Sequence, residues 1–151
     1  MVLFDMKAKL FLLCGLLTLG GCDKLGQKAF DSIPNPSAAQ EKVAEQAYND
    51  LKEKNFDQFL MHLEPELKDE FMKDEKTLRK FSASLPKTEL KHKKIVSKSM
   101  ETESNKPSLY TVTYEYSYDK NLVQYDVSFD KPNGSTKIRK LGVSVFGEST
   151  N

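Results

Sequence analysis

The most constraining feature of the sequence is a strict two-residue alternation over residues 109–118. Apolar or aromatic residues hold every second position, while threonine, glutamate and serine lie between them. The apolar set is Tyr110, Val112, Tyr114, Tyr116 and Tyr118. Successive side chains of a β-strand point to opposite faces, so this run predicts a strand with one buried and one solvated face.

Three further segments complete a predicted sheet. Residues 123–130 repeat the alternation, and residues 119–121 suit a tight turn between the two runs. The strongest turn signal is Pro132-Asn133-Gly134, which leads to a last strand expected over residues 136–146. A weaker strand is expected before all of these, over residues 89–99. The four strands follow one another along the chain and predict an antiparallel meander.

Ile138 is out of step with the alternation that follows it in the last predicted strand. One extra residue in a strand shifts every later side chain to the opposite face. A β-bulge is therefore expected near Arg139.

The first half of the domain shows helical spacing of its apolar residues. Ser37 with Gln40 forms a capping box that starts an amphipathic helix of about 18 residues. Asn55 is expected to cap a second, short helix. Pro65 suits the first position of a third helix, because its missing N–H has no partner there in any case.

Asp74 falls in a gap of the apolar face of the third helix. Two interpretations stay open. Asp74 caps a fresh turn after a kink at Lys73, which is favoured, or it enters a cavity as a polar ligand group.

The fold class expected from these patterns is α+β. Three N-terminal helices pack on one face of a curved four-stranded antiparallel sheet, in a single domain over residues 37–147. Residues 148–151 are expected to form a C-terminal tail.

The N-terminus has the three parts of a secretory signal. Lys7 and Lys9 precede an apolar run over residues 10–19, and the small residues Gly20 and Gly21 follow. The run is too short for a membrane span, which needs roughly 20 residues. Residues 1–21 are therefore predicted to be a signal peptide, and its true start is either Met1 or Met6.

The ending Leu19-Gly20-Gly21-Cys22 resembles the lipobox of bacterial lipoproteins. That resemblance implies cleavage before Cys22 and attachment of fatty acyl chains, such as palmitate, to the new N-terminal residue. Asp23 is similar to the signal that keeps enterobacterial lipoproteins on the inner membrane. The expected location is the cell envelope, on the periplasmic face of the inner membrane in preference to the outer membrane. Residues 22–36 mix glycine, proline and charge, and are expected to form a flexible lipidated tether.

The predicted domain resembles the nuclear-transport-factor-2-like, or cystatin-like cone, superfamily. The residues that carry this resemblance are the helix over residues 39–54, Asn55-Phe56-Asp57, Glu64-Pro65-Glu66-Leu67 and the strand over residues 110–118. Most similar are its small bacterial lipoproteins of uncharacterised function. The resemblance implies a curved sheet around a long helix with a pocket at its open end. Some members are isomerases or cyclases, and many only bind.

Charge argues against nucleic acid as a partner. The chain has 23 basic and 22 acidic side chains, and Lys7, Lys9 and Asp5 lie in the signal segment, which leaves 21 of each sign in the remainder. Nucleic-acid binding depends on an excess of basic contacts to phosphate. The cysteines, Cys14 and Cys22, both precede the domain, so no disulfide framework is expected within it.

No metal or cofactor site is expected. His62 and His92 do not share a metal-ligand spacing with carboxylates, and no nucleophile motif is present. His62 is expected at the surface or the rim. The lysines of residues 87–98 either meet acidic lipid head groups or protect an edge strand from pairing, and the second interpretation is favoured.

The tyrosine stripe carries the remaining site candidates. Buried hydroxyls need hydrogen-bond partners, so Tyr114, Tyr116 and Tyr118 either pack in the core or line a pocket for a small apolar ligand. Core packing is favoured for Tyr114.

The expected function is that of a non-catalytic, membrane-anchored module that binds an envelope protein. A small-ligand carrier or sensor is the first alternative. An enzyme of the cyclase or isomerase type is the second, and the absence of a carboxylate from the apolar face of the predicted sheet disfavours it.

Overall fold

The computed structural model describes residues 22–149, with side chains from residue 26 onward. The chain divides into two compact units, one ending at Ile33 and one beginning at Pro34. The predicted signal peptide over residues 1–21 lies outside the described residues, as do the side chains of Cys22 and Asp23. No helix in the described part of the chain has the length and apolar character needed to cross a membrane.

The predicted tether is helical where a flexible coil was expected. Helix α2 spans Cys22–Ser32, and the hydroxyl of Ser32 donates to the carbonyl of Ala29 at its end. Glycine costs a helix only about 1 kcal/mol, so Gly26 does not prevent it. The prolines that stop helices, Pro34 and Pro36, come after its last residue.

The second unit contains the predicted sheet. Its strands are β1 (His92–Glu101), β2 (Leu109–Ser117), β3 (Asn121–Phe129) and β4 (Lys140–Gly147), paired antiparallel in the order β1-β2-β3-β4. This confirms the predicted meander. β1 and β4 are its two edges, and a register irregularity at Val96 interrupts β1.

The last strand begins at Lys140 and not at residue 136 as expected, its register with β3 is continuous, and Arg139 lies just before it. The backbone N–H of Arg139 donates to the carbonyl of Ser128 at 2.8 Å, although the register pairs Ser128 with Lys140. The chain therefore leaves the regular ladder at Arg139, before the first residue of β4. Ile138 turns instead to Leu63, with which it forms a short parallel bridge.

Four helices precede the sheet in this unit: α3 (Ala38–Glu53), α4 (Phe56–Met61), α5 (Pro65–Lys73) and α6 (Glu75–Ser84). With α2 the described residues contain five helices, so the prediction of three was wrong. The predicted third helix is divided at Asp74, which ends α5 and caps α6. The capping box of Ser37 and Gln40 is present at the start of α3, as predicted.

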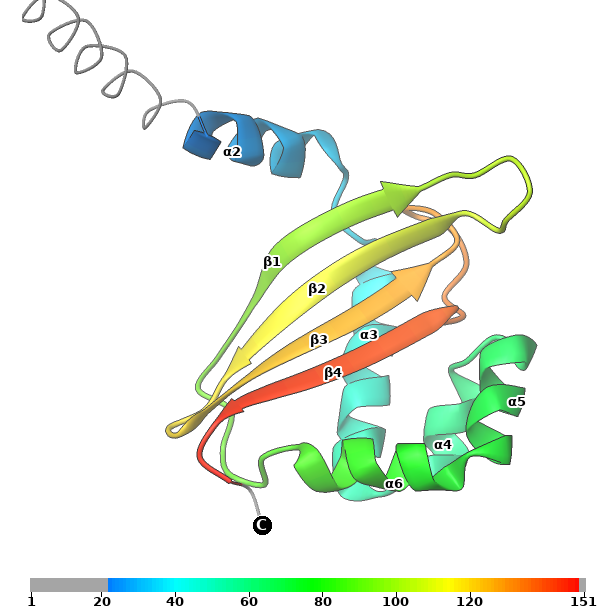
Figure 1. Cartoon of the computed structure of the whole chain (residues 1–151), viewed down its shortest axis with the longest axis vertical. Helices are drawn as coiled ribbons and strands as arrows, with labels where there is room; N and C mark the ends of the chain where they lie inside the picture. The colour runs from blue at the N-terminus through cyan, green and yellow to red at the C-terminus, as the bar shows by residue number, and fades with distance from the viewer. Residues whose placement is uncertain (1–21, 150–151) are drawn as a thin grey trace, which may run out of the picture. The chain divides into compact units, whose positions relative to one another are not determined.

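Helix α3 lies against one face of the curved sheet, and α4, α5 and α6 continue from its C-terminal end (Figure 1). The hydroxyl of Tyr125 in β3 donates to the carbonyl of Ala44 in α3 at 3.0 Å, which fixes α3 over the centre of the sheet. The described strands curve but do not close into the cone that the family resemblance implies, because the sheet has four strands and two separate edges.

Candidate functional site

The tyrosine stripe forms the core between α3 and the sheet. The ring of Tyr48 in α3 lies 4.2 Å from that of Tyr116 and 5.2 Å from that of Tyr125, measured between centroids. Tyr114 stacks beside Tyr116 at 6.3 Å. These rings fill the space in which a ligand of the sheet's inner face would lie.

Most of these phenols have a hydrogen-bond partner. Tyr48 and Tyr118 share a hydrogen bond of 2.7 Å between their hydroxyls, and the hydroxyl of Tyr110 donates to the carbonyl of Pro34 at 2.6 Å. The buried hydroxyl of Tyr114 has no partner in the described structure. A polar atom left in this state lowers stability, because water has been removed from it without replacement.

Burial raises the pKa of these tyrosines. It is the main cause for Tyr48, Tyr114, Tyr116 and Tyr125, and neighbouring phenols add to it. Burial also raises the pKa of Tyr110 to about 12. The phenols therefore stay neutral at physiological pH and serve as packing groups.

The structure brings the three sequence-predicted tyrosines together in the core, but within the described residues they line no open pocket, and Asp74 lies apart from them. Tyr114, Tyr116 and Tyr118 are at most 7% exposed and lie in the core. Asp74 lies at the surface as the N-cap of α6, where its carboxylate accepts hydrogen bonds from the N–H and the hydroxyl of Thr77. These bonds lower the pKa of Asp74. The favoured interpretation of Asp74 as a cap is confirmed.

A different place collects polar side chains around an open cleft. It lies between α5, the loop before β2 and the start of β4, and has a volume of about 350 Å³. Its apolar lining comes from Leu67, which is buried, Leu109, which is half-buried, and Pro107, which is exposed. Its rim bears three acidic and three basic residues, which are Glu64, Glu66, Glu70, Lys106, Arg139 and Lys140.

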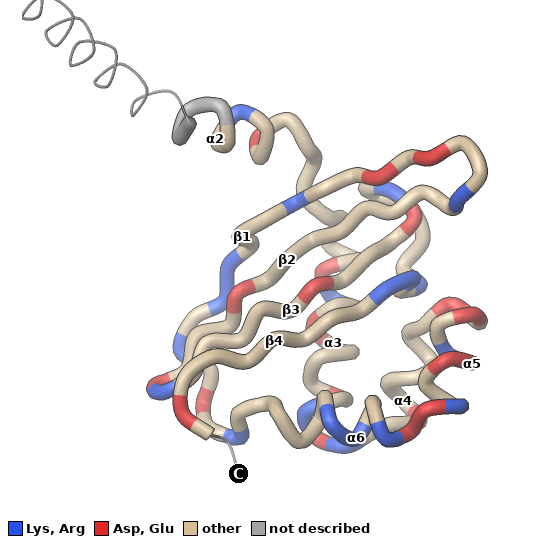
Figure 2. The backbone as a smooth tube through the Cα atoms, viewed as in Figure 1, with Lys and Arg blue, Asp and Glu red and all other residues tan. Residues whose placement is uncertain are grey.

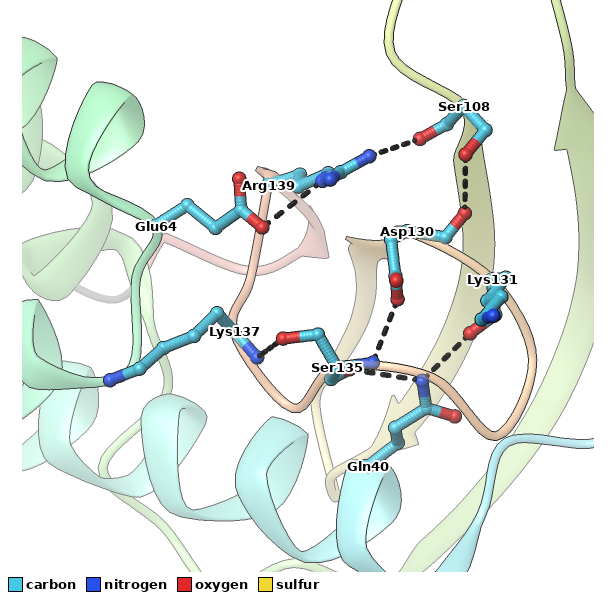
Figure 3. Close-up of polar contacts among 8 residues, drawn as sticks. All are labelled: Gln40, Glu64, Ser108, Asp130, Lys131, Ser135, Lys137 and Arg139. Atoms are coloured by element: carbon cyan, nitrogen blue, oxygen red, sulfur yellow. Dashed lines mark hydrogen bonds and ion pairs between the residues drawn. The ribbon is translucent and has the colours of Figure 1, made fainter.

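Arg139 holds the walls of this cleft in place (Figure 3). Its Nε donates to Glu64 Oε1 at 3.1 Å, and its Nη1 donates to the carbonyl of Ser108 at 2.9 Å. Three segments distant in sequence are thus joined through one guanidinium. A planar guanidinium suits this role, because its donors point in fixed directions. The Arg139 and Glu64 side chains are 25% and 30% exposed, so both remain accessible.

The loop that delivers Arg139 is fastened by Gln40. Nε2 of this fully buried side chain donates to the carbonyls of Lys131 and Ser135 at 2.9 and 3.1 Å (Figure 3). Its Oε1 accepts from the backbone N–H groups of Ser37 and Asn133, each at 3.1 Å. The capping glutamine of α3 therefore also positions the loop between β3 and β4.

Charges gather unevenly over the second unit (Figure 2). Lysines follow β1, and most are neutralised: Lys93 pairs with Glu45 at 3.1 Å and Lys94 with Glu115 at 2.9 Å. The position of β1 at the sheet edge agrees with the favoured interpretation of these lysines as edge protection. His62 is part-buried, and its Nε2 lies 2.9 Å from Asp50 Oδ2.

The cleft was not found from the sequence, because its residues come from three separate segments. One signal pointed toward it: Ile138 out of step indicated that the chain near Arg139 leaves the regular sheet. Within the described residues, His, Cys, Asp and Glu do not cluster in a way that could hold a metal ion. No protein-family model, curated protein or solved structure significantly matches this chain.

Proposed function

We propose that this chain is a lipid-anchored protein of the bacterial envelope, whose domain binds a segment of a partner protein without catalysing a reaction. The observation that carries the proposal is the cleft beside Arg139. A cleft lined by three apolar residues and six charged residues of both signs resembles the anatomy of protein interfaces, which combine an apolar centre with a polar edge.

The fixed position of Arg139 supports binding through this cleft. Hydrogen bonds to Glu64 and Ser108 hold the guanidinium before a partner arrives. A preorganised side chain loses little conformational entropy on binding, which leaves more of the contact energy as affinity. The balanced rim favours a segment that carries both signs of charge over a polyanion.

The anchor part of the proposal depends on Cys22, with Asp23 as the sorting residue for the inner membrane's periplasmic face. Acyl chains on Cys22 would hold the protein at the membrane, since each buried methylene contributes about 0.8 kcal/mol. Cys22→Ser is expected to move the protein from the membrane fraction to the soluble fraction. Asp23→Ser is expected to move it to the other membrane.

A small-ligand carrier is the second candidate, and one observation favours it. The partnerless hydroxyl of Tyr114 could donate to a ligand acceptor. Against it, Tyr48, Tyr116 and Tyr125 fill the adjacent space with contacting rings. We therefore favour partner binding at the surface.

Site-specific photocrosslinking of the full chain in its own membranes tests the proposal. A benzophenone amino acid at position 106, in the cleft, should give one dominant protein-sized adduct. The same amino acid in place of Lys94, on β1, should not. Glu70→Lys should reduce the adduct, because it reverses a charge on the rim.

Equal adducts at both positions, or none at position 106, would contradict the proposal. Native mass spectra of the chain after exposure to envelope extract separate the two candidates. A protein-sized shift supports partner binding. A small discrete adduct that is lost in Tyr114→Phe supports the carrier.

A further inference from the structure

The two edges of the sheet differ in their chemistry. β1 carries Lys93, Lys94 and Lys98 and has a register irregularity, both of which discourage pairing with another strand. β4 has no charged residue from position 141 to position 147. An uncharged edge strand is a template for strand addition.

The hydrogen-bond pattern shows which groups β4 turns outward. The N–H of Glu148 donates to the carbonyl of Lys120 at 3.2 Å, so this pair is a hydrogen-bonded one. Such pairs alternate along an antiparallel ladder. Even-numbered residues of β4 thus bond to β3, and Val143 and Val145 direct their backbone N–H and C=O away from the sheet.

A hollow lies beside this edge. Helix α6 presents Lys80, Ala83 and Ser84 toward the end of β4, around a volume of about 400 Å³ that reaches Val145 and Glu148. In Figure 1 α6 lies on the side of β4 away from β3, and the hollow joins its C-terminal end to the end of the strand. Alanine and serine are small, which leaves room between helix and strand for an extended segment.

We infer that the partner protein contributes an extended segment that pairs antiparallel with β4, between β4 and α6, as a fifth strand. This inference rests on the proposed function and names the form of the partner. The cleft beside Arg139 lies at the start of β4, where Lys140 lines it, and the hollow at α6 lies at the other end. One extended segment can therefore occupy both.

Charge sets the pattern of the segment. Lys140 lies at one end of β4 and Glu148 just past the other; both are exposed, and Glu148 also pairs with Lys120 at 3.0 Å, an exposed contact that a basic residue of the segment can share. An antiparallel segment meets Glu148 first and Lys140 last. It is therefore expected to begin with a basic residue, continue with uncharged residues and end with an acidic one.

A third element of recognition is a hollow of about 260 Å³ on the outer face of the sheet, lined by Gly142, Asp126 and Ser128 among others. Glycine has no side chain to cover it. A large side chain directly opposite Gly142 would pack there, as aromatic residues do over glycine in neighbouring strands. The residue of the segment that lies opposite Gly142 is therefore expected to be aromatic. It follows the residue opposite Ser144 by two positions, toward the acidic end of the segment.

A lone segment fits this place better than a second copy of the chain. Helix α6 lies beside the C-terminal end of β4, at Val145 and Gly147, and narrows the free space there. A second copy that paired through its own β4 would bring its own α6 into the same region.

The experiment uses the full chain in detergent and a synthetic probe peptide, Lys-Leu-Gly-Val-Ser-Val-Phe-Gly-Glu. This peptide copies residues 140–148 and has the expected charge order. Amide hydrogen exchange read by NMR should show Val143 and Val145 exchanging fast in the free protein and protected with the peptide. A peptide N-methylated at alternate residues should bind at least about tenfold more weakly, because it loses backbone hydrogen bonds.

Val143→Pro is the matching protein variant, since its N–H is not used inside the sheet and edge strands tolerate proline. It should weaken peptide binding about tenfold or more. Met100→Pro on the other edge should leave binding unchanged. Circular dichroism confirms that both variants fold, and the N-methylated peptide gives the same test without altering the protein.

Unprotected amides at Val143 and Val145, or equal binding by Val143→Pro, would overturn the inference. So would a free chain of twice the expected mass with both amides already protected, because the occupant would then be a second copy. If position 106 still crosslinks a protein in Val143→Pro, strand addition is rejected and the proposal of partner binding in the cleft is kept. If the peptide protects β4 but position 106 gives no adduct, the proposal of binding in the cleft is rejected and strand addition is kept.

Discussion

Gln40 shows how one side chain can serve two elements. Its capping role was predictable from the spacing to Ser37. Its bonds to Lys131, Ser135 and Asn133 were not, because they join residues 91 to 95 positions apart in the sequence. A buried amide with all four hydrogen-bond positions occupied stabilises the loop only while every partner is present.

Gln40→Leu is expected to destabilise the domain by about 2–4 kcal/mol, since it leaves several buried backbone groups without partners. Urea denaturation followed by circular dichroism measures this. Gln46→Leu, an exposed position of the same helix, is the control and should change stability by less than about 0.5 kcal/mol. Similar midpoints for both variants would show that the clamp contributes little.

Replacing two core tyrosines by phenylalanine is expected to change the stability of the domain in opposite directions. The hydroxyl of Tyr125 donates to the carbonyl of Ala44, whereas that of Tyr114 has no partner. Tyr125→Phe should cost about 1 kcal/mol, and Tyr114→Phe should gain about 1 kcal/mol because it removes an unsatisfied buried group. Thermal denaturation of both variants decides this. A loss of stability in Tyr114→Phe would mean that its hydroxyl is satisfied, for example by water.

At the scale of elements, the sequence pattern predicted the strands and the helix caps, because interactions between residues close in sequence determine them. The strands were recognised because a half-buried sheet requires period two, and β2 begins at Leu109 as expected. The division of the third helix at Asp74 was foreseen as a cap. Helix α2 was not predicted, because its glycine and its charged residues were interpreted as the composition of a flexible tether. The cleft beside Arg139 was missed because it is assembled by tertiary contacts alone.

The separation of α5 from α6 depends on the cap. Asp74→Ala should fray the first turn of α6, because the N–H of Thr77 loses its acceptor. Asp74→Asn should keep the turn, since the asparagine side chain also accepts this bond. Amide exchange at Thr77 measures the difference. The hydrogen bonds from Thr77 lower the pKa of Asp74 in the folded state. The stability that the charged cap contributes is therefore fully present above the ordinary pKa of an aspartate, and it is lost as the pH falls through the lowered pKa.

At the scale of the whole molecule, the buried tyrosines make the stability of the domain depend on pH in the alkaline range. The chain has six tyrosines, and all belong to this core. The unfolded chain ionises its phenols near pH 10, whereas burial raises the pKa in the folded state, to about 12 for Tyr110 and further for most of the others. Above pH 10 the unfolded state therefore binds fewer protons than the folded state.

Stability should consequently be unaffected by the phenols below pH 10 and should fall as pH rises from about 10 toward the folded pKa values. Each phenol contributes up to about 1.4 kcal/mol per pH unit, so several together give a steep loss. Phenolate absorbance and far-ultraviolet circular dichroism should change in one shared transition, because the rings cannot ionise until the core opens. Phenolate absorbance that rises near pH 10 while the circular dichroism stays native would contradict this, and would mean that solvent reaches the rings between α3 and the sheet. Added salt separates this effect from the loss of lysine charge, since surface ion pairs are screened and buried phenols are not.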